Sequence, residues 1–355
     1  MNKDFHYYGT YYAARFAGYS RADAEEIAWA AQMVDDFTES EFGHHFPNRD
    51  AIFTSQTLGE MASICSYEDV TDEIFQHLRR VWAVFHFLPG NYSNSSLQMN
   101  DGFDFGKYNF SYERELRDFK CICTPNSELV KFLVESVRVN CTSNIRVGIL
   151  MHVIADTWAH QGFCGSPNRN INNIENLSGQ SRNLIHSYDI GKDYMNLYLG
   201  HARLDHLPDY GFAQYTYKPS WSKDSIAVDN VQRFFDAFCQ MVEALQYING
   251  YYNPFSDFEL KGYYRENEQD NIPTVVRNHR HLIGRIFESG GTDQSTTWVS
   301  EMSNIDDLGS PEPYNKNRYG DYAFNEFEQE AVIHLDKVMN FVDARVKGYF
   351  RDNNL

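Results

Sequence analysis

The sequence has little positive charge. Its 31 lysine and arginine residues are outnumbered by 49 aspartates and glutamates, which gives a formal net charge of -18 at pH 7. Proteins that hold nucleic acid on a broad surface do so mainly through lysine and arginine contacts to phosphates. The composition therefore argues against such a protein. It does not exclude chemistry on a phosphate ester, because bound divalent metal ions would reverse the potential locally.

Long hydrophobic runs are also missing. No uncharged apolar segment of the sequence approaches the roughly 18 residues of a membrane-spanning helix. The N-terminus has no basic segment followed by an apolar one, as a secretory signal would. We therefore expect no transmembrane segment. The chain would be cytoplasmic, or exported without a classical signal peptide, or trimmed of its signal.

Cysteine is sparse and lacks a metal-binding spacing. The 6 cysteines are dispersed, and Cys121-Ile-Cys123 does not have the two-residue gap of the usual zinc knuckle. A chain of 355 residues can bury a large core without disulfides. We therefore expect the cysteines to be reduced thiols.

Familiar catalytic motifs are missing as well. The sequence contains no H-E-x-x-H motif, no adjacent His-Asp pair, and no G-x-S-x-G, Walker-type or G-x-G-x-x-G loop. These absences argue against a zincin protease, an HD phosphohydrolase, a serine-nucleophile enzyme and a nucleotide-binding fold.

Helical periodicity, in contrast, is abundant. The first forty residues indicate a helical hairpin, in which one amphipathic helix ends at Gly18 and the next is capped by Ser20, with Asp23 three residues later. The range 79–90 fits either a continuing helix or a short extended segment. Further helices are predicted over 127–139, 144–161, 183–202, 225–248, 274–288 and 324–350.

Long polar segments separate these helices. Loops are expected over 91–112, 165–182, 251–272 and 289–321. Loops of this length in a compact domain are usually functional. The sequence shows no internal repeat, low-complexity tract or composition break. We therefore predict an all-α fold, in which residues 1–355 form a single multi-helix domain with long loops.

One predicted helix carries a row of polar side chains. In HVIADTWAHQGFCG, His152, Asp156 and His160 recur at every fourth residue. Such positions share one helix face, with neighbouring Cβ atoms about 6 Å apart. The central carboxylate could bridge two cations about 3.5–4 Å apart. Because an unpaired carboxylate is costly to bury among apolar residues, we favour a metal site, with zinc as the first candidate, over a buried hydrogen-bond network.

Other imidazoles and carboxylates stand where folding does not require them. Asp35 and Asp36 end the second helix, where the helix dipole disfavours anions. We favour Asp35 as a ligand because it continues the small-residue face that includes Ala28 and Ala31. The remaining candidates are His6, His86, His201, Asp205 and Asp209. Each also has a structural alternative, such as an aromatic-cluster histidine at His6 or a helix cap at His201.

Four blocks of the sequence resemble a bacterial family catalogued only as a domain of unknown function. The blocks are residues 4–36, FHFLPG (85–90), LMHVIADTWAHQGFCG (150–165) and LGHARLDHLPD (199–209). That family supplies no activity.

A more distant resemblance implies an activity. The H-x-x-x-D-x-x-x-H row, an early histidine, an aspartate at the end of the following helix and a later histidine resemble the zinc-dependent phospholipases C and the fungal single-strand-specific nucleases. Those all-α enzymes hold a zinc cluster with histidine and aspartate side chains and cleave phosphodiesters with a metal-activated water. The resemblance implies a fold of that type, two or three zinc ions, Asp156 as a bridge, and as further ligands His6, Asp35, His86, His152, His160 and His201.

The sequence departs from those enzymes at two ligand positions. They use the amino group of an N-terminal tryptophan as a ligand, whereas this chain begins with Met1. His6 would replace that ligand near the chain start. Their last ligand is a carboxylate after the final histidine, a role that Asp205 or Asp209 could fill.

The leading functional prediction is a metal-dependent phosphoric ester hydrolase with Asp35 and Asp156 in its catalytic centre. The net charge favours a phospholipid or a small phosphodiester as substrate over nucleic acid. Tyr215, Tyr217 and Trp221 could stack on a choline-like head group through cation–π contacts. A nuclease is one alternative. Another is a helical interaction or toxin-like protein with a structural metal and a protein partner on its acidic surface, and a third is a metal-free polar network.

Overall fold

Helix dominates the fold. The computed structural model describes residues 1–45, 52–56, 60, 72–92, 97, 112–140, 143–181, 198–250, 272–291 and 293–350. Within these residues the only sheet is a small antiparallel one of three strands. The predicted helical class is therefore confirmed, with a sheet that the sequence reading did not include.

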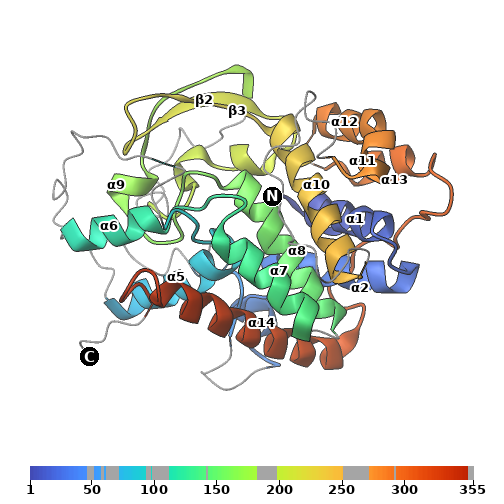
Figure 1. Cartoon of the computed structure of the whole chain (residues 1–355), viewed down its shortest axis with the longest axis horizontal. Coiled ribbons are helices and arrows are strands. Elements are labelled where there is room, and N and C mark those ends of the chain that lie inside the picture. The colour runs from blue at the N-terminus through green and yellow to red at the C-terminus, as the bar shows by residue number, and fades with distance from the viewer. Residues whose placement is uncertain are drawn as a thin grey trace.

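Helix α8 (Asn144–Ala159) runs through the middle of the fold and carries the row of polar residues (Figure 1). All of its residues from Val147 to Ala159 are buried. The helices that pack against it are α1 (Thr10–Phe16), α2 (Arg21–Asp36), α5 (Asp72–Phe85), α7 (Glu128–Asn140), α10 (Asn230–Ile248) and α14 (Gly320–Asp343). Polar side chains on α8 are therefore enclosed by other elements.

Helices α2 and α8 approach each other closely at Gly148. A Cβ atom at this position would lie 2.3 Å from the Ile27 carbonyl oxygen and 2.6 Å from the Ala30 Cβ. The small residues of α2 thus pack closely against a neighbouring helix, as their pattern predicts. This contact holds the C-terminal turn of α2 beside the polar row.

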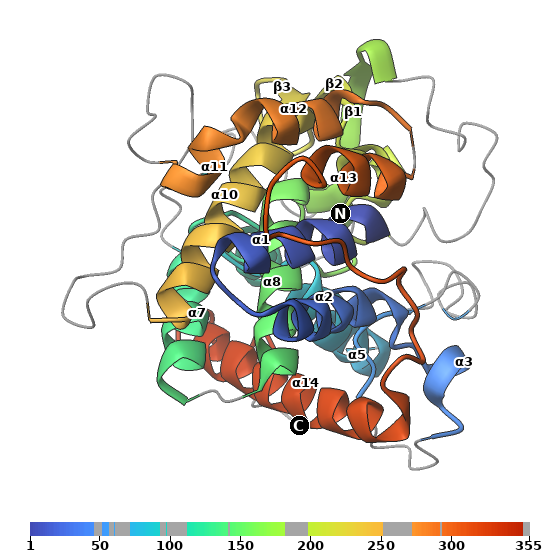
Figure 2. The ribbon, with the colours of Figure 1, turned by 90° about the vertical axis from the view of Figure 1, so that its right-hand side faces the viewer.

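The N-terminal hairpin begins with a π-helical segment, η1 (Asp4–Gly9), that continues into α1. Gly18 then takes a positive φ of 86° in the turn before α2. The Ser20 hydroxyl oxygen accepts a hydrogen bond from the Asp23 amide at 3.1 Å, so the predicted N-cap is confirmed. Figure 2 shows α1 and α2 side by side.

The small sheet lies beside one end of the helical body (Figures 1 and 2). Its strands are β1 (Ile174–Ser178), β2 (Gln214–Pro219) and β3 (Ile226–Asp229), in the order β1-β2-β3. The remaining helical elements are α3 (Glu39–Phe42), α6 (Tyr112–Lys120), α9 (Arg169–Asn172), η6 (Ala202–Leu204), η7 (Leu207–Asp209), α11 (Thr274–Asn278), α12 (Arg280–Glu288) and α13 (Ser295–Met302).

Several predicted element boundaries are wrong. The expected loop 165–182 contains α9 and β1, and the expected loop 289–321 contains α13. The predicted helix 225–248 begins only at Asn230, because strand β3 comes first and the Asp229 side chain caps the helix by accepting from the Val231 amide. The predicted helix 324–350 ends at Asp343.

Other predictions fall partly or wholly outside the described residues. Most of the expected helix 183–202 lies there, and its described end has no α-helix. Nearly all of the expected loops 91–112 and 251–272 lie there too. For the range 79–90 the structure shows a helix that ends at Phe85, followed by a bridge between Pro89 and Cys123.

One large hydrophobic core includes residues from Met1 to Phe350, so it draws on both ends of the chain. Smaller clusters pack under the sheet. Cys121, Cys123, Cys164 and Cys239 are buried free thiols, whereas Cys65 and Cys141 lie outside the described residues. In the described part of the chain, no helix has the length and apolar character needed to cross a membrane.

Candidate metal centre

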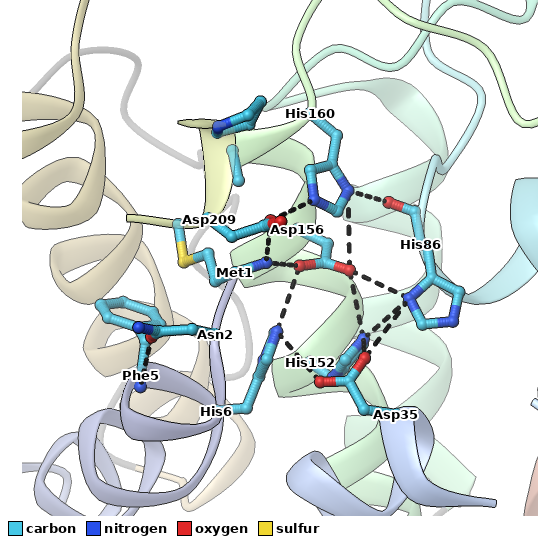
Figure 3. Close-up of polar contacts among 12 residues, drawn as sticks. Met1, Asn2, Phe5, His6, Asp35, His86, His152, Asp156, His160 and Asp209 are labelled. Atoms are coloured by element: carbon cyan, nitrogen blue, oxygen red, sulfur yellow. Dashed lines mark hydrogen bonds and ion pairs between the residues drawn. The ribbon is translucent and has the colours of Figure 1, made fainter. Parts of the chain in front are cut away.

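The polar row of α8 faces side chains that come from several separate elements (Figure 3). His6 comes from η1, Asp35 from the last turn of α2, and His86 from the residue after α5. His201 and Asp209 come from the 3-10 turns between α9 and β2. The positions predicted from the sequence therefore converge on one side of α8. We call His6, Asp35, His86, His152, Asp156, His160, His201 and Asp209 the histidine–aspartate cluster.

Asp156 lies at the centre of this cluster and is 1% exposed. Five nitrogen atoms surround its two carboxylate oxygens: the Met1 amino group at 2.5 Å, His152 Nε2 at 3.1 Å, His6 Nε2 at 3.2 Å, His86 Nδ1 at 3.3 Å and His160 Nδ1 at 3.7 Å. A carboxylate with partners on both oxygens is suited to bridge two cations.

Backbone carbonyl groups fix the orientation of four of the histidines. One ring nitrogen of each lies at hydrogen-bond distance from a carbonyl oxygen: His152 Nδ1 at 2.8 Å from Ala31, His160 Nδ1 at 2.9 Å from His86, His86 Nε2 at 2.9 Å from Thr54, and His201 Nδ1 at 2.9 Å from Asp205. Since a carbonyl can only accept, that nitrogen carries the proton. In a neutral imidazole the second nitrogen then has a lone pair.

These lone pairs point mainly at carboxylates, although His152 Nε2 also lies 3.4 Å from His86 Nδ1. His152 Nε2 lies 3.1 Å from Asp156, His160 Nε2 lies 3.2 Å from Asp209, and His201 Nε2 lies 3.7 Å from Asp209. Two acceptors that face each other repel unless a cation lies between them. Backbone-oriented imidazoles whose free nitrogens converge with carboxylates are the usual environment of a protein-bound metal ion.

Protons on His6, His152 and His201 do not remove this repulsion at neutral pH. Burial is the largest influence on His6, His152 and His201, and it lowers the pKa of each to about 4. His86 differs: burial opposes its charge, but Asp156 and Asp35 outweigh burial and raise its pKa. His6, His152 and His201 therefore stay neutral beside the carboxylates at neutral pH.

The potential ligand atoms form three groups, each within 4.8 Å: His6 with His152 and Asp156, Asp35 with His86 and His152, and His160 with His201 and Asp209. His152 belongs to two of the groups, and Asp156 lies next to all three. Histidine and aspartate are both good zinc ligands. The donor set therefore fits more than one divalent ion.

Two predicted ligands lie outside these groups. Asp36 points elsewhere because Tyr314 and Gln32 donate to its carboxylate. The Asp205 carboxylate faces His206 at 3.7 Å, and only the Asp205 backbone carbonyl contacts the cluster, through His201. Of the two carboxylates considered for the last position, Asp209 is the one that meets the histidines.

The sequence reading also missed a group. The Met1 amino group is buried, 2.5 Å from Asp156 and 3.4 Å from Asp209. Burial disfavours its charge, but Asp156, Asp209 and Asp35 outweigh burial and raise its pKa to about 10. The resemblance had indicated a terminal amino group at this position, but we had expected His6 to replace it because the chain begins with Met1 and not with tryptophan.

A cavity of about 520 Å³ opens onto the cluster. Its walls include Asp35, His86, Asp156, His160, His201 and Asp209, together with Trp82, Phe87, Leu199 and Tyr210. None of the described residues that line it is a lysine or an arginine. The cluster is thus accessible from a pocket with apolar and aromatic walls.

The aromatic residues predicted to bind substrate do not line this cavity. Tyr215, Tyr217 and Trp221 are 3%, 1% and 3% exposed. Tyr215 and Tyr217 are two residues apart along β2, so their side chains lie on the same face of the strand. Both rings pack into a small hydrophobic core under the sheet. The Trp221 indole donates to the Gly162 carbonyl at 3.2 Å. The three aromatic residues expected to stack on a head group are thus buried away from the cavity, which takes its aromatic walls from Trp82, Phe87 and Tyr210.

Comparison with known proteins identifies the family without an activity. A family model described as Family of unknown function (DUF6765) matches residues 1–352, so the chain belongs to that family. No match was found among curated proteins or among solved structures.

Proposed function

We propose that this member of a family of unknown function is a zinc-dependent phosphoric ester hydrolase, with two or three ions in the histidine–aspartate cluster. One observation carries the proposal. Histidine rings that backbone carbonyls orient turn their second nitrogens towards three buried or partly buried carboxylates, with no lysine or arginine among the described residues of the cavity. The earlier resemblance to zinc-dependent phospholipases C and single-strand-specific nucleases agrees with this donor set.

The ligands would form two sets on either side of Asp156. Asp156 would bridge the ions. His6, Asp35, His86 and His152 would complete the ligands on one side. His160, His201 and Asp209 would complete them on the other. When bound, zinc lowers the pKa of a coordinated water towards about 7 and stabilises charge on phosphoryl oxygens.

The cavity favours a catalytic role over a purely structural one. Structural zinc sites are usually closed by four protein ligands, whereas catalytic sites keep a position open to substrate. Here Asp35, Asp156 and Asp209 all border the 520 Å³ cavity. This supports an enzyme over the alternative of a helical interaction or toxin-like protein with a structural metal.

We further propose a phospholipid or a small phosphodiester as substrate. No lysine or arginine is among the described residues that line the cavity, so the metal ions and the Met1 amino group would be the main positive charges facing a phosphate. The formal net charge of -18 disfavours a long polyanion. Trp82 and Tyr210 offer aromatic surface to an organic substituent. A nuclease remains the alternative, and single-stranded DNA belongs in the test.

The test combines metal analysis with a substrate panel. Protein purified without added metal is analysed for bound metals. It is then assayed with zinc on bis(p-nitrophenyl) phosphate, p-nitrophenylphosphorylcholine and single-stranded DNA. We expect more than one ion per chain and hydrolysis of a small phosphodiester.

Matched variants distinguish a loss of the metal site from a general effect of replacing a buried histidine. His160→Gln should abolish hydrolysis. His334→Gln should keep it, because His334 is a buried histidine outside the cluster that contacts the Val84 carbonyl. Bound metal without hydrolysis of any substrate would support the structural alternative. Less than one ion per chain would exclude the metal centre.

A further inference from the structure

A segment near the C-terminus crosses the two N-terminal helices. Residues 307–318, which we call the strap, run between α13 and α14 and lie over α1 and α2 (Figure 2). Hydrogen bonds fasten it there: Tyr11 to the Leu308 carbonyl at 3.1 Å, Tyr7 to the Glu312 carbonyl at 2.8 Å, Trp29 to the Lys316 carbonyl at 3.1 Å, and Arg318 to Glu25 at 2.6 Å. The strap therefore contacts α2, which supplies Asp35, and the continuous segment of η1 and α1, which supplies His6.

One strap residue reaches the end of α2. The Tyr314 hydroxyl donates to Asp36 Oδ2 at 2.5 Å, and Gln32 donates to Asp36 Oδ1 at 3.3 Å. Both oxygens of Asp36 thus have donors. The Tyr314 ring also packs edge-on against Tyr7, with ring centroids 5.1 Å apart. Asp36 is held by its contacts even though it does not face the cluster.

Asp35, the neighbouring residue, is held much less firmly. Its nearest nitrogen atoms are His86 Nδ1 and His152 Nε2, both at 3.8 Å, and His6 Nε2 at 3.9 Å. No donor among the described residues lies at hydrogen-bond distance from its carboxylate. Its side chain is 31% exposed, against 1% for Asp156. Asp35 is therefore the member of the cluster with the weakest restraints of its own.

We propose that Tyr314 is a positioning residue for Asp35 and acts through Asp36. Adjacent residues on a helix point about 100° apart. A bond that fixes the direction of Asp36 therefore also fixes the rotation of the last turn of α2. That rotation aims Asp35 at His86 and His152. The inference rests on the proposed function, because it takes Asp35 as a metal ligand.

The test is the variant Tyr314→Phe, which removes the hydroxyl and keeps the ring. Zinc affinity is measured by chelator competition on the full chain, and the d–d absorption of the cobalt-substituted protein reports the ligand geometry. Loss of groups that orient ligands commonly weakens metal affinity about 10–100-fold. For this indirect contact we expect about tenfold weaker binding of one ion, with a changed cobalt spectrum and the remaining metal unaffected.

The matched control is Tyr11→Phe. It removes another tyrosine hydroxyl that binds the strap, but through the Leu308 carbonyl and not through Asp36. Its cobalt spectrum and zinc affinity should match those of the wild type. Asp36→Leu should reproduce the loss seen in Tyr314→Phe. Asp36→Asn, which keeps an acceptor oxygen for the hydroxyl, should recover most of the affinity.

The outcomes separate the two proposals. Wild-type metal binding with an unchanged Tyr314→Phe spectrum would overturn the positioning role and leave the metal centre intact. An equal loss in Tyr11→Phe would also overturn it, since general docking of the strap would then suffice. If the wild type binds no metal, the proposed function itself fails. If Tyr314→Phe does not fold, the contrast between Asp36→Leu and Asp36→Asn decides.

Discussion

This protein has two groups of buried polar side chains, and they differ in whether their hydrogen-bond donors and acceptors match. The first surrounds Arg79 and is satisfied from within, and we call it the Arg79 network. Its bonds run from Arg79 to Asp118 at 2.8 Å, from Asn168 to Asp118 at 2.8 Å, from Asn170 to Glu115 at 2.6 Å, from Arg79 to the Tyr349 carbonyl at 2.9 Å, and from Asn172 to the Ser166 carbonyl at 2.8 Å. Every contact here joins a donor to an acceptor.

The histidine–aspartate cluster is also largely buried, but its donors and acceptors do not match. The Met1 amino group and His86 face Asp156 as donors. The second nitrogens of His152 and His201, however, face aspartates with lone pairs. Both nitrogens of His6 are buried without a hydrogen bond among the described residues. The difference teaches that burial of polar groups alone says little about function. A network whose donors and acceptors match is structural, whereas we propose that the cluster, whose donors and acceptors do not match, binds cations.

The largest expected effect comes from removing the central carboxylate of the cluster. Asp156→Asn keeps the shape of the side chain but removes the charge that would bridge the metal ions. We expect a loss of hydrolytic activity of about 10³-fold, because metal ions supply several kcal/mol of transition-state stabilisation. Saturating zinc, which stabilises a protein by about 4 kcal/mol at 1,000 times its Kd, should no longer raise the melting temperature. Normal zinc stabilisation of this variant would contradict the bridging role.

The corresponding change in the Arg79 network should lower the stability of the protein and leave its zinc affinity unchanged. Asp118→Asn leaves the buried Arg79 guanidinium without its anion, since the side chains are 4% and 0% exposed. Breaking such a pair costs about 3–5 kcal/mol. We expect urea denaturation to show this loss at every zinc concentration, while zinc affinity and activity of the folded fraction stay the same. If zinc affinity fell in Asp118→Asn as well, the two regions would not be independent.

A smaller effect is expected where the cluster depends on helix packing. Gly148→Ala would place a methyl group 2.3 Å from the Ile27 carbonyl and push α2 away from α8. Overpacking of this kind costs about 1–3 kcal/mol. Zinc affinity should fall too, because the bond between His152 and the Ala31 carbonyl crosses this contact. Gly284→Ala in α12 is the control, since a Cβ there meets no atom within 4 Å, and it should leave both quantities unchanged or slightly higher.

The smallest expected effect is on the pH dependence of stability. It comes from a buried histidine outside both the histidine–aspartate cluster and the Arg79 network. Burial lowers the pKa of His334 to about 4, below the value near 6.5 of an unfolded chain. Below pH 6.5 the unfolded chain therefore binds a proton at His334 more readily than the folded protein does. The free energy of unfolding is highest above pH 6.5 and falls as the pH drops towards 4. His334→Gln should make the decline in unfolding free energy between pH 7.5 and 5.5 smaller by about 1 kcal/mol at saturating zinc. An unchanged slope would show that His334 does not titrate in this range.

The cluster was largely predictable because its central part follows from local periodicity. The four-residue spacing of His152, Asp156 and His160 fixes one face of a helix, and Asp35 lies at the end of a helix with a small-residue face. Which carboxylate completes the cluster was not predictable, because Asp205 and Asp209 differ only in how the 3-10 turns orient them.

Long-range packing explains what the sequence reading got wrong. Tyr215 and Tyr217 lie outside every predicted helix and loop. They belong to a strand, and a strand becomes visible only with the partners with which it pairs. The strand β1 and the helix α13 are short, so their periodicity does not stand out from polar surroundings. The Met1 amino group has no side-chain signal at all, and only the fold brings it to Asp156.

The most direct test of the account is anomalous diffraction from crystals of the protein grown with zinc and measured just above the zinc absorption edge. The account predicts two or three strong anomalous peaks inside the histidine–aspartate cluster, with Asp156 between them, and none in the Arg79 network. A map without a peak at Asp156, or with zinc only on the molecular surface, would contradict it.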